Sequence, residues 1–310
     1  MATRGILTLA FGKPKYIEMA KSLARSLILH DPTLMRAIVT DSTDPQLGDL
    51  FTYRIDLRPE YGANVRQKMF LDRYTPFDET LFIDSDSLAA RPLDAFWSAF
   101  QPVPFGVCGV RLLYPGEHDE YLDVDFILNH FNLTTLPKFN GGIYYFKRSP
   151  AATAVFATAR DLLSQASELR FSSFRNDGPA DEALYSVAMA MHGLTVTDMG
   201  TGGMWTPIGS TIPLALDIPN GICTFIKRGR ALRPHIFHVA TFTESRFYLR
   251  ECSRLEHLAH GHPNLTRSEE LQLTSTVATL WMRRKANGLR RRLLHLAPPS
   301  SHPVGHPVHL

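Results

Sequence analysis

The fold of this chain is indicated by the stretch TLFIDSD at residues 80–86, a largely apolar run that ends in two aspartates one position apart. The run predicts a short buried strand that stops at Asp84. Ligands of α/β proteins gather at the carboxyl ends of strands, where the backbone opens into loops. Two carboxylates there, Asp84 and Asp86, can hold Mg²⁺ or Mn²⁺ and leave coordination positions for substrate phosphates. The alternative is a solvated turn whose aspartates cap the next element.

The same Asp-x-Asp pattern occurs a second time, as DVD at residues 123–125. No apolar strand precedes this copy, so we expect an exposed loop there without a metal ion. A position at the end of a buried strand therefore favours the first copy as the metal site.

Strands and helices alternate on both sides of the opening stretch. Apolar runs predict further strands at residues 6–11, 37–40, 51–57, 105–113 and 142–146. Helical spacing of apolar residues predicts helices at residues 16–29, 65–74, 150–166 and 180–192. Residues 199–220 are rich in Gly, Pro and Thr, which indicates loops around short strands. This β-α-β order predicts an α/β domain with a mostly parallel sheet.

The composition excludes several classes of protein. The chain has 310 residues, of which 44% are hydrophobic, so it can form a large core. Its net charge is +3, but residues 281–310 contain six basic residues and no acidic one, so the rest carries −3. A mildly acidic body argues against nucleic-acid binding. The three cysteines form no CxxC pair and indicate no disulfide framework. No apolar run reaches the roughly 20 residues of a membrane-spanning helix.

Four further features accompany the strand-end aspartates. Lys68 lies sixteen residues before Asp84, and FNGG (139–142), DE (181–182) and FHV (237–239) follow in that order. Together these segments resemble the GT-A glycosyltransferases, especially the glycogenin-like and bacterial lipooligosaccharide galactosyltransferases of family 8. The resemblance covers about residues 5–250. It implies the GT-A fold, a Rossmann-like and mostly parallel sheet that binds a nucleotide diphosphate sugar.

The resemblance also implies a role for each segment. Asp84, Asp86 and His238 would hold Mn²⁺ or Mg²⁺, while Asp181 and Glu182 would lie at the reacting sugar. The first strand end would form the nucleotide pocket, with the ring of Tyr16 stacked on the base. The residues expected to contact the donor are Ala10, Tyr16, Lys68, Asp84, Ser85, Asn140, Gly141, Gly142 and Arg246.

Three positions depart from the family's pattern. Gly141 stands where relatives carry Ala or Ser, and Glu182 stands where they carry Gln. The lysine that follows the late histidine in the family is missing, and Arg246 lies eight residues after His238. Because Glu182 is a carboxylate, it can act as a base or a nucleophile, or it can neutralise a nearby arginine.

Purely structural interpretations remain open for several of these residues. Lys68 also fits an ordinary surface lysine, residues 140–142 fit a turn into the next strand, and Asp181 fits a helix N-cap. His238 competes with His235 as the metal ligand, and a histidine between apolar residues is often a core residue.

The predicted function is transfer of a sugar from a nucleotide diphosphate donor, a UDP-sugar, to a hydroxyl of a glycan, lipid-linked or protein acceptor. The family resemblance favours retention of the anomeric configuration. A divalent ion and a lysine would stabilise the charge that grows on the leaving diphosphate. Two alternatives are a nucleotidyltransferase that makes the nucleotide sugar and a non-catalytic module that binds it. Residues 10–14 (AFGKP) are too short for the phosphate loop of the former.

The end of the chain differs in character from the rest. We expect a GT-A domain over residues 1–250 and a basic extension over 251–310, helical at 268–296 and disordered at 298–310. Six basic residues between Arg283 and Arg292 are interleaved with Trp281 and leucines, so the helix can lie on an anionic membrane surface or pack on the body. The cysteine usage predicts a cytoplasmic protein. If the tail binds membrane, the protein is peripheral on the inner face of the membrane.

Overall fold

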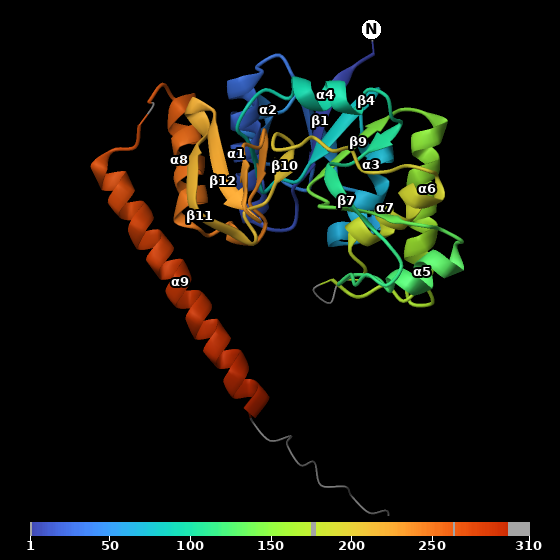
Figure 1. Ribbon diagram of the computed structural model, residues 1–310. Coiled ribbons are helices and arrows are strands. Elements are labelled where there is room, and N and C mark those ends of the chain that lie inside the picture. The colour runs from blue at the N-terminus through green and yellow to red at the C-terminus, as the bar shows by residue number, and fades with distance from the viewer. Residues whose placement is uncertain (1, 175–177, 263, 297–310) are drawn as a thin grey trace, which may run out of the picture.

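The strand that ends at Asp84 lies inside a six-stranded sheet of the computed structural model (Figure 1). The strands are, from one edge to the other, β3 (Tyr53–Asp56), β2 (Met35–Thr40), β1 (Arg4–Leu9), β4 (Glu79–Ile83), β9 (Ile143–Lys147) and β6 (Phe105–Gly106). Strands β3, β2, β1 and β4 run parallel, while β9 is antiparallel to both β4 and β6. The α/β prediction with a mostly parallel sheet is confirmed.

The structure describes residues 2–174, 178–262 and 264–296, and at residues 211–213, 284 and 287–296 it describes the backbone alone. The α-helices in these ranges are α1 (Pro14–His30), α2 (Leu47–Leu50), α3 (Leu71–Tyr74), α4 (Asp94–Phe100), α5 (Val124–His130), α6 (Pro150–Ser164), α7 (Asp181–Met191), α8 (Arg246–Ala259) and α9 (Arg267–Leu296). Short 3₁₀ segments complete the helical set at Pro59–Tyr61, Asn64–Phe70, Ile218–Asn220 and Ala240–Phe242.

The core lies on both faces of the central sheet, because side chains of a strand alternate between its two faces. Phe82 of β4 and Tyr144 of β9 point into the cluster that α6 and α7 cover. Leu81, Ile83 and Tyr145 point to the other face, where α1 and α4 supply the cover. Both faces of the sheet are therefore buried, and its carboxyl edge is the part left open for a ligand.

Three small sheets surround the central one. They are β10 (Met204–Trp205) with β14 (Ile236–His238) and β5 (Ser87–Ala89), then β11 (Ser210–Asp217) with β12 (Ile222–Lys227) and β13 (Arg230–Leu232), and finally β7 (Gly109–Leu113) with β8 (Leu136–Phe139). In the first of these sheets, β5 directly follows the two aspartates and pairs antiparallel with β14. This pairing brings the late part of the chain to the end of β4.

Some predicted elements differ from those observed. The helix expected at 65–74 is a 3₁₀ segment, Asn64–Phe70, followed by the short α3, because the side chain of Gln67 donates to the carbonyls of Arg58 and Gly62 and ties it to the preceding loop. The strand expected at 105–113 is divided into β6 and β7, which pair with different partners, β9 and β8.

The segment expected to be an exposed loop, and the one expected to hold loops around short strands, are both more regular than that. The DVD segment begins a helix, since Asp123 is the N-cap of α5 and accepts a hydrogen bond from the backbone N–H of Phe126. Residues 199–220 include the eight-residue strand β11, whose pairing with β12 supplies the backbone partners that a loop would lack.

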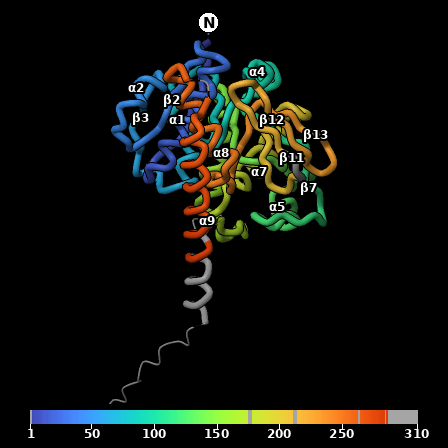
Figure 2. The backbone as a smooth tube through the Cα atoms, turned by 90° about the vertical axis from the view of Figure 1, so that its left-hand side faces the viewer, coloured from blue at the N-terminus to red at the C-terminus, as the bar shows by residue number. Residues whose placement is uncertain are grey.

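The predicted domain boundary after residue 250 falls inside α8, which packs on α1. Helix α9 then leaves the body and extends away from it, as both backbone views show (Figures 1 and 2). Within the described ranges, no helix is long and apolar enough to cross a membrane. The disorder predicted for 298–310 lies outside the described residues.

Candidate metal and donor site

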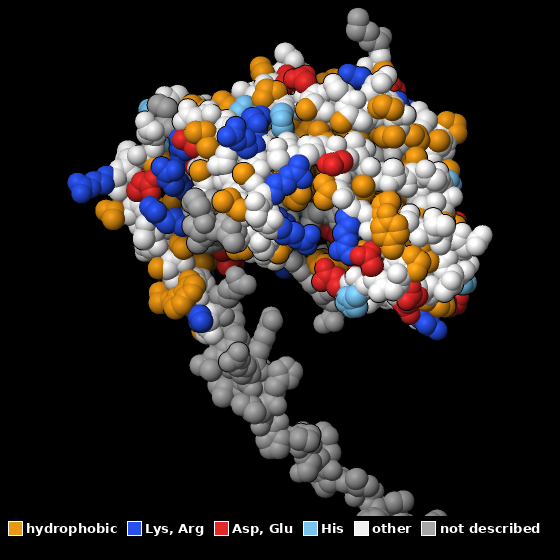
Figure 3. All heavy atoms as spheres, viewed as in Figure 1, with side chains coloured by type: hydrophobic (Ala, Val, Ile, Leu, Met, Phe, Trp, Pro, Cys, Tyr) orange, Lys and Arg blue, Asp and Glu red, His pale blue; other side chains and the backbone are white. Residues whose placement is uncertain are grey.

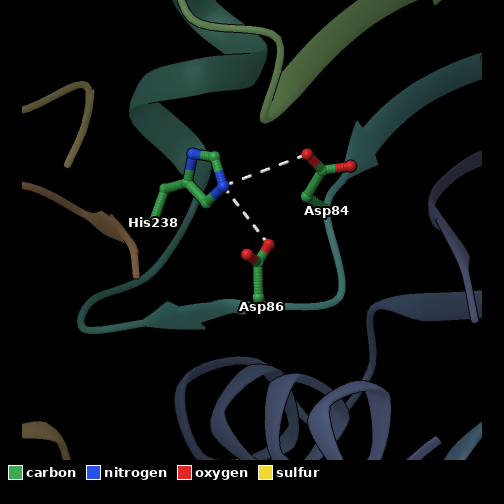
Figure 4. A group of neighbouring side chains, drawn as sticks. All are labelled: Asp84, Asp86 and His238. Carbon is green, nitrogen blue, oxygen red and sulfur yellow. Dashed lines mark ion pairs between the residues drawn. The ribbon is translucent and has the colours of Figure 1, made fainter. Parts of the chain in front are cut away.

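Two aspartates and one histidine meet at the end of β4 (Figure 4). The Nε2 atom of His238 lies 3.2 Å from Oδ1 of Asp86 and 3.9 Å from Oδ2 of Asp84. The potential ligand atoms of all three residues lie within 4.8 Å of one another. Carboxylate oxygens with one imidazole nitrogen suit Mn²⁺ or Mg²⁺, so the residues present fit the predicted cation.

Backbone hydrogen bonds explain why these three side chains converge. The N–H of Asp84 donates to the carbonyl of Gly142 at 2.9 Å, and the N–H of Val239 donates to the carbonyl of Asp86 at 3.0 Å. Between them, Ser87 of β5 lies opposite His238 of β14 in the antiparallel register. The sheet pairing therefore selects His238 for this position. His235 instead bonds through Nδ1 to the carbonyl of Pro92.

The ring of His238 is oriented by Asn140. Nδ1 of the imidazole lies 2.7 Å from Oδ1 of Asn140, which also accepts from the backbone N–H of Gly142 at 3.1 Å. Because an amide oxygen only accepts, this pairing assigns a proton to Nδ1 and leaves Nε2 facing the aspartates. A Cβ atom at Gly142 would lie 2.5 Å from Nδ1, so the contact requires glycine.

Burial and charge act against each other in this cluster. Burial raises the pKa of Asp84, and Lys68 only partly opposes the increase. Burial would also raise the pKa of Asp86, but His238 lowers it below the usual value. The pKa of His238 is raised, since the attraction of Asp86 and Asp84 exceeds the effect of burial. Two close carboxylates of this kind favour a cation between them and the imidazole.

Lys68 bridges the metal cluster and the start of α7. Its Nζ lies 2.9 Å from Oδ2 of Asp84 and 3.0 Å from Oδ2 of Asp181, and it donates to the carbonyl of Gly141 at 3.0 Å. Burial would lower the pKa of Lys68, but the carboxylates of Asp181 and Asp84 raise it overall. Lys68 is thus a buried cation with two acidic partners, which argues against the ordinary surface lysine considered above.

Asp181 and Glu182 lie beside this bridge. The N-cap of α7 is Ala180, and the carboxylate of Asp181 accepts from Lys68 and from the hydroxyl of Tyr144, so Asp181 is not a helix cap. Oε1 of Glu182 accepts from the backbone N–H of Gly141 at 2.9 Å. Burial, and next the charge of Asp181, raise the pKa of Glu182 to about 7.

Other predicted donor contacts lie at the site's margin or outside it. Ala10 is buried just after β1, Tyr16 is 36% exposed at the start of α1, and Ser85 is buried between the two aspartates. Arg246 begins α8 and forms its ion pair with Glu270 of α9, at 2.9 Å. The donor roles of these four residues stay predictions, and Arg246 shares no described contact with the Asp84 cluster.

The structure adds two residues that sequence reasoning missed. The hydroxyl of Tyr144 donates to Oδ2 of Asp181 at 2.7 Å, and Lys138 lies on the other side of Glu182, paired with Asp119 at 2.5 Å. Alternation along β9 could have placed Tyr144 on the face of Phe82, but no local signal places Lys138 near Glu182. Figure 3 shows this face of the molecule hollowed, with Lys, Arg, Asp and Glu side chains gathered around the hollow.

Comparisons were made with protein families, curated proteins and solved structures. No family model and no curated protein matches the sequence. Two crystal structures of LgtC match the fold. One is an active-site mutant with Gln replaced by Glu (TM-score 0.55), and the other is the galactosyltransferase in complex with donor and acceptor sugar analogs (TM-score 0.51). In both, the identity is 13%, and the match covers 85% of this chain and 98% of the other.

Mouse xyloside xylosyltransferase 1 also matches, at 12% identity over 78% of this chain and 99% of its own, with a TM-score of 0.47. The two LgtC structures establish the fold, because their TM-scores lie above 0.5. The mostly parallel central sheet and the strand-end aspartates are then those expected for that architecture. This chain has the GT-A fold of glycosyltransferases, as the sequence resemblance implied.

Proposed function

We propose that this protein is a metal-dependent glycosyltransferase that moves a sugar from a UDP-sugar to an acceptor hydroxyl on a glycan, lipid-linked or protein substrate. The observation that carries the proposal is the Asp84, Asp86 and His238 cluster at the carboxyl edge of the sheet of a GT-A fold. The LgtC structures support the substrate class, since one of them is described with donor and acceptor sugar analogs.

In the proposed mechanism, positive charges surround the diphosphate that leaves the sugar. Asp84, Asp86 and His238 would hold Mn²⁺ or Mg²⁺, which supplies positive charge to the leaving diphosphate. Lys68 remains protonated between two carboxylates, so it adds a fixed positive charge where the diphosphate would leave. Asn140 keeps the imidazole in its ligating tautomer by holding the proton on Nδ1.

The sugar side of the site would be formed by the start of α7 and the loop before β9. Asp181 and Asn140 would position the sugar, and Ser85, Gly141 and Gly142 would line its pocket. Ala10 and Tyr16 would receive the nucleotide, and Arg246 would contact the donor. Glu182 would lie at the reacting carbon, and we propose a retaining outcome. Product with inverted anomeric configuration would contradict that outcome.

Changing Asp86 to Ala tests the metal site. We expect Asp86→Ala to weaken Mn²⁺ binding by about a hundredfold or more, since loss of even an outer partner of a ligand costs roughly 10–100-fold. Mn²⁺ affinity is measured by electron paramagnetic resonance, first without nucleotide and then with UDP-galactose or UDP-glucose. The fold should persist because the Asp86 side chain is 24% exposed and its loss leaves no buried cavity.

The matched control is Asp123→Ala, which removes an aspartate from the second Asp-x-Asp pattern. Asp123 caps α5 and pairs with Arg170 at 3.2 Å, so its loss should cost about 1 kcal/mol of stability and leave Mn²⁺ affinity unchanged. Equal loss of metal affinity in both variants would contradict the assignment. If GDP- or CMP-sugars stabilise the wild-type protein and no UDP-sugar does, the assignment of a UDP-sugar as the donor is wrong.

A further inference from the structure

Tyr144 has a buried hydroxyl that meets the start of α7. Its side chain is fully buried on β9, and the hydroxyl donates to Oδ2 of Asp181 at 2.7 Å. Nζ of Lys68 lies 3.0 Å from the same oxygen. Both donors described for this carboxylate therefore meet at Oδ2.

The other oxygen of Asp181 is in a different position. No described residue donates a hydrogen bond to Oδ1, and Oδ1 is not among the buried polar atoms that lack a partner. It follows that Oδ1 has contact with solvent, although the residue as a whole is only 6% exposed. A carboxylate anchored through one oxygen by a phenol and an ammonium group cannot rotate freely, so Oδ1 keeps its direction.

Gly141 provides the space for this arrangement. A Cβ atom at this position would lie 2.7 Å from the Tyr144 hydroxyl and 2.7 Å from Oδ2 of Asp181, both closer than such contacts allow. The glycine at 141 and the tyrosine hydroxyl are therefore sterically linked.

The packing of the core does not need the hydroxyl of Tyr144. The ring of Tyr144 packs against Phe82, Phe105 and Tyr185, contacts that phenylalanine would make equally well. Burial of a hydroxyl costs free energy unless a hydrogen bond offsets it, and a bond to a charged acceptor is the kind that offsets it best.

We propose that Tyr144 is a positioning residue, which with Lys68 holds Asp181 so that Oδ1 accepts a hydrogen bond from a hydroxyl of the donor sugar. The inference rests on the proposed function, because it needs a nucleotide sugar as ligand. It adds a residue that the resemblance did not assign, and it gives Gly141 a steric reason.

The first test compares a nucleotide sugar with its bare nucleotide. In the presence of Mn²⁺, we expect Tyr144→Phe to raise the Kd for UDP-galactose or UDP-glucose about tenfold, the effect of one hydrogen bond to a charged group. The Kd for UDP should not change, since UDP has no sugar for Oδ1 to hold. A purely structural role would alter both affinities equally, and that result, or no change in either, would overturn the proposal.

The matched control is Tyr145→Phe. Tyr145 is the next residue on β9, is equally buried, and donates to a carboxylate, Glu79, at 3.0 Å on the opposite face of the sheet. Its loss should leave the ratio of the two affinities unchanged. A shift in this ratio equal to that of Tyr144→Phe would show that any lost core hydroxyl is sufficient, which contradicts a specific role for Tyr144.

The second test needs no ligand and is a double-mutant cycle on stability. We expect Gly141→Ala to lower the midpoint of urea unfolding, and to lower it less in a Tyr144→Phe background, because one of the two closest contacts is then gone. Equal losses in both backgrounds would contradict the steric pairing. The double-mutant cycle can show the expected coupling while the wild-type protein binds no nucleotide sugar. In that case the proposed function and the role of Oδ1 are both wrong, but the steric contact between position 141 and Tyr144 is still established.

Discussion

Glu182 is an acidic residue whose surroundings oppose its charge. Burial and the neighbouring Asp181 raise its pKa to about 7, against an ordinary value of 4.5, while Lys138 and Lys68 lower it by less. Near neutral pH the side chain is therefore present in both protonation states. This gives a carboxyl group that can accept or donate a proton under ordinary conditions, which a glutamine could not do.

This pKa predicts a pH dependence of stability that Glu182→Gln should remove. Below pH 4.5 the group is protonated in both the folded and unfolded states and contributes nothing. As the pH rises from 4.5 to about 7, the unfolded state loses its proton first, so the wild-type protein loses stability. We expect Glu182→Gln to be more stable than the wild type at pH 8 and similar at pH 4.5, measured by urea unfolding.

The control for this experiment is Glu117→Gln. Glu117 is partly exposed, and the backbone N–H of Tyr114 lowers its pKa, so the sign of its contribution is opposite. Its replacement should not stabilise the protein at pH 8. A Glu182→Gln variant with the same pH dependence as the wild type would show that Glu182 has an ordinary pKa.

Helix α9 is the element that differs most from the rest of the fold. It begins at Arg267, where Glu270 lies 2.9 Å from Arg246 and 2.7 Å from Arg250 of α8. Further along, Trp281 is 60% exposed and Met282 is 57% exposed. The body therefore does not cover these two side chains, which weakens the alternative in which the helix packs on the body through them. The leucines and arginines of 287–296 lie where the structure describes the backbone alone.

Deletion of residues 281–310 tests membrane binding by this helix. We expect the full chain to sediment with vesicles that contain anionic lipid, because each basic side chain near the surface contributes about 1 kcal/mol. The truncated chain should stay in the supernatant and keep its activity on a small acceptor in solution, since no proposed site residue is removed. Binding of the full chain should also weaken in high salt.

A substitution set provides the control for that deletion. Changing Arg283, Arg284 and Lys285 to Gln keeps the helix length but removes half of the six basic charges of residues 281–310. This variant should bind anionic vesicles more weakly and neutral vesicles no differently. Equal sedimentation of the full and truncated chains, or a large drop in the melting temperature on truncation, would favour a packed helix.

At the scale of the whole molecule, α8 belongs to the body. Leu255 of this helix is buried, Arg254 pairs with Asp217 at 2.9 Å, and Glu256 pairs with Arg25 of α1 at 3.3 Å. Glu251 is buried and accepts from the backbone N–H of Ile218. The packed body of the fold therefore includes the whole of α8, on both sides of residue 250.

Two truncations distinguish these boundaries. We expect residues 1–250 to unfold at a temperature many degrees lower than the full chain, or without a cooperative transition, because removal of Leu255 alone costs about 2–5 kcal/mol. Residues 1–265 should unfold close to the full chain, since they keep the contacts between α8 and α1. Circular dichroism melting is the measurement, and equal melting temperatures for the two truncations would contradict the assignment of α8 to the body.

The sequence by itself determined the features that depend on neighbours along the chain. The apolar run at 80–83 and the aspartates that follow it predicted β4 and placed two carboxylates at its end, because the buried apolar run stops where the acidic residues begin. The alternation of strands and helices predicted the sheet type. The sequence shows a glycine at position 141 but not the reason for it. A Cβ there would collide with atoms of Tyr144 and of Asp181, and Asp181 lies forty positions away in the chain.

Only the tertiary structure decided which distant residues meet. The pairing of β5 with β14 selected His238 over His235, and pairing of β7 with β8 broke the strand expected at 105–113. The second Asp-x-Asp pattern became a helix cap because of its own local hydrogen bond, which the pattern of residue types does not distinguish from a loop. Sheet register and the burial of charge at Lys68 and Glu182 are set by contacts between segments, and such contacts leave no periodic signal in the chain.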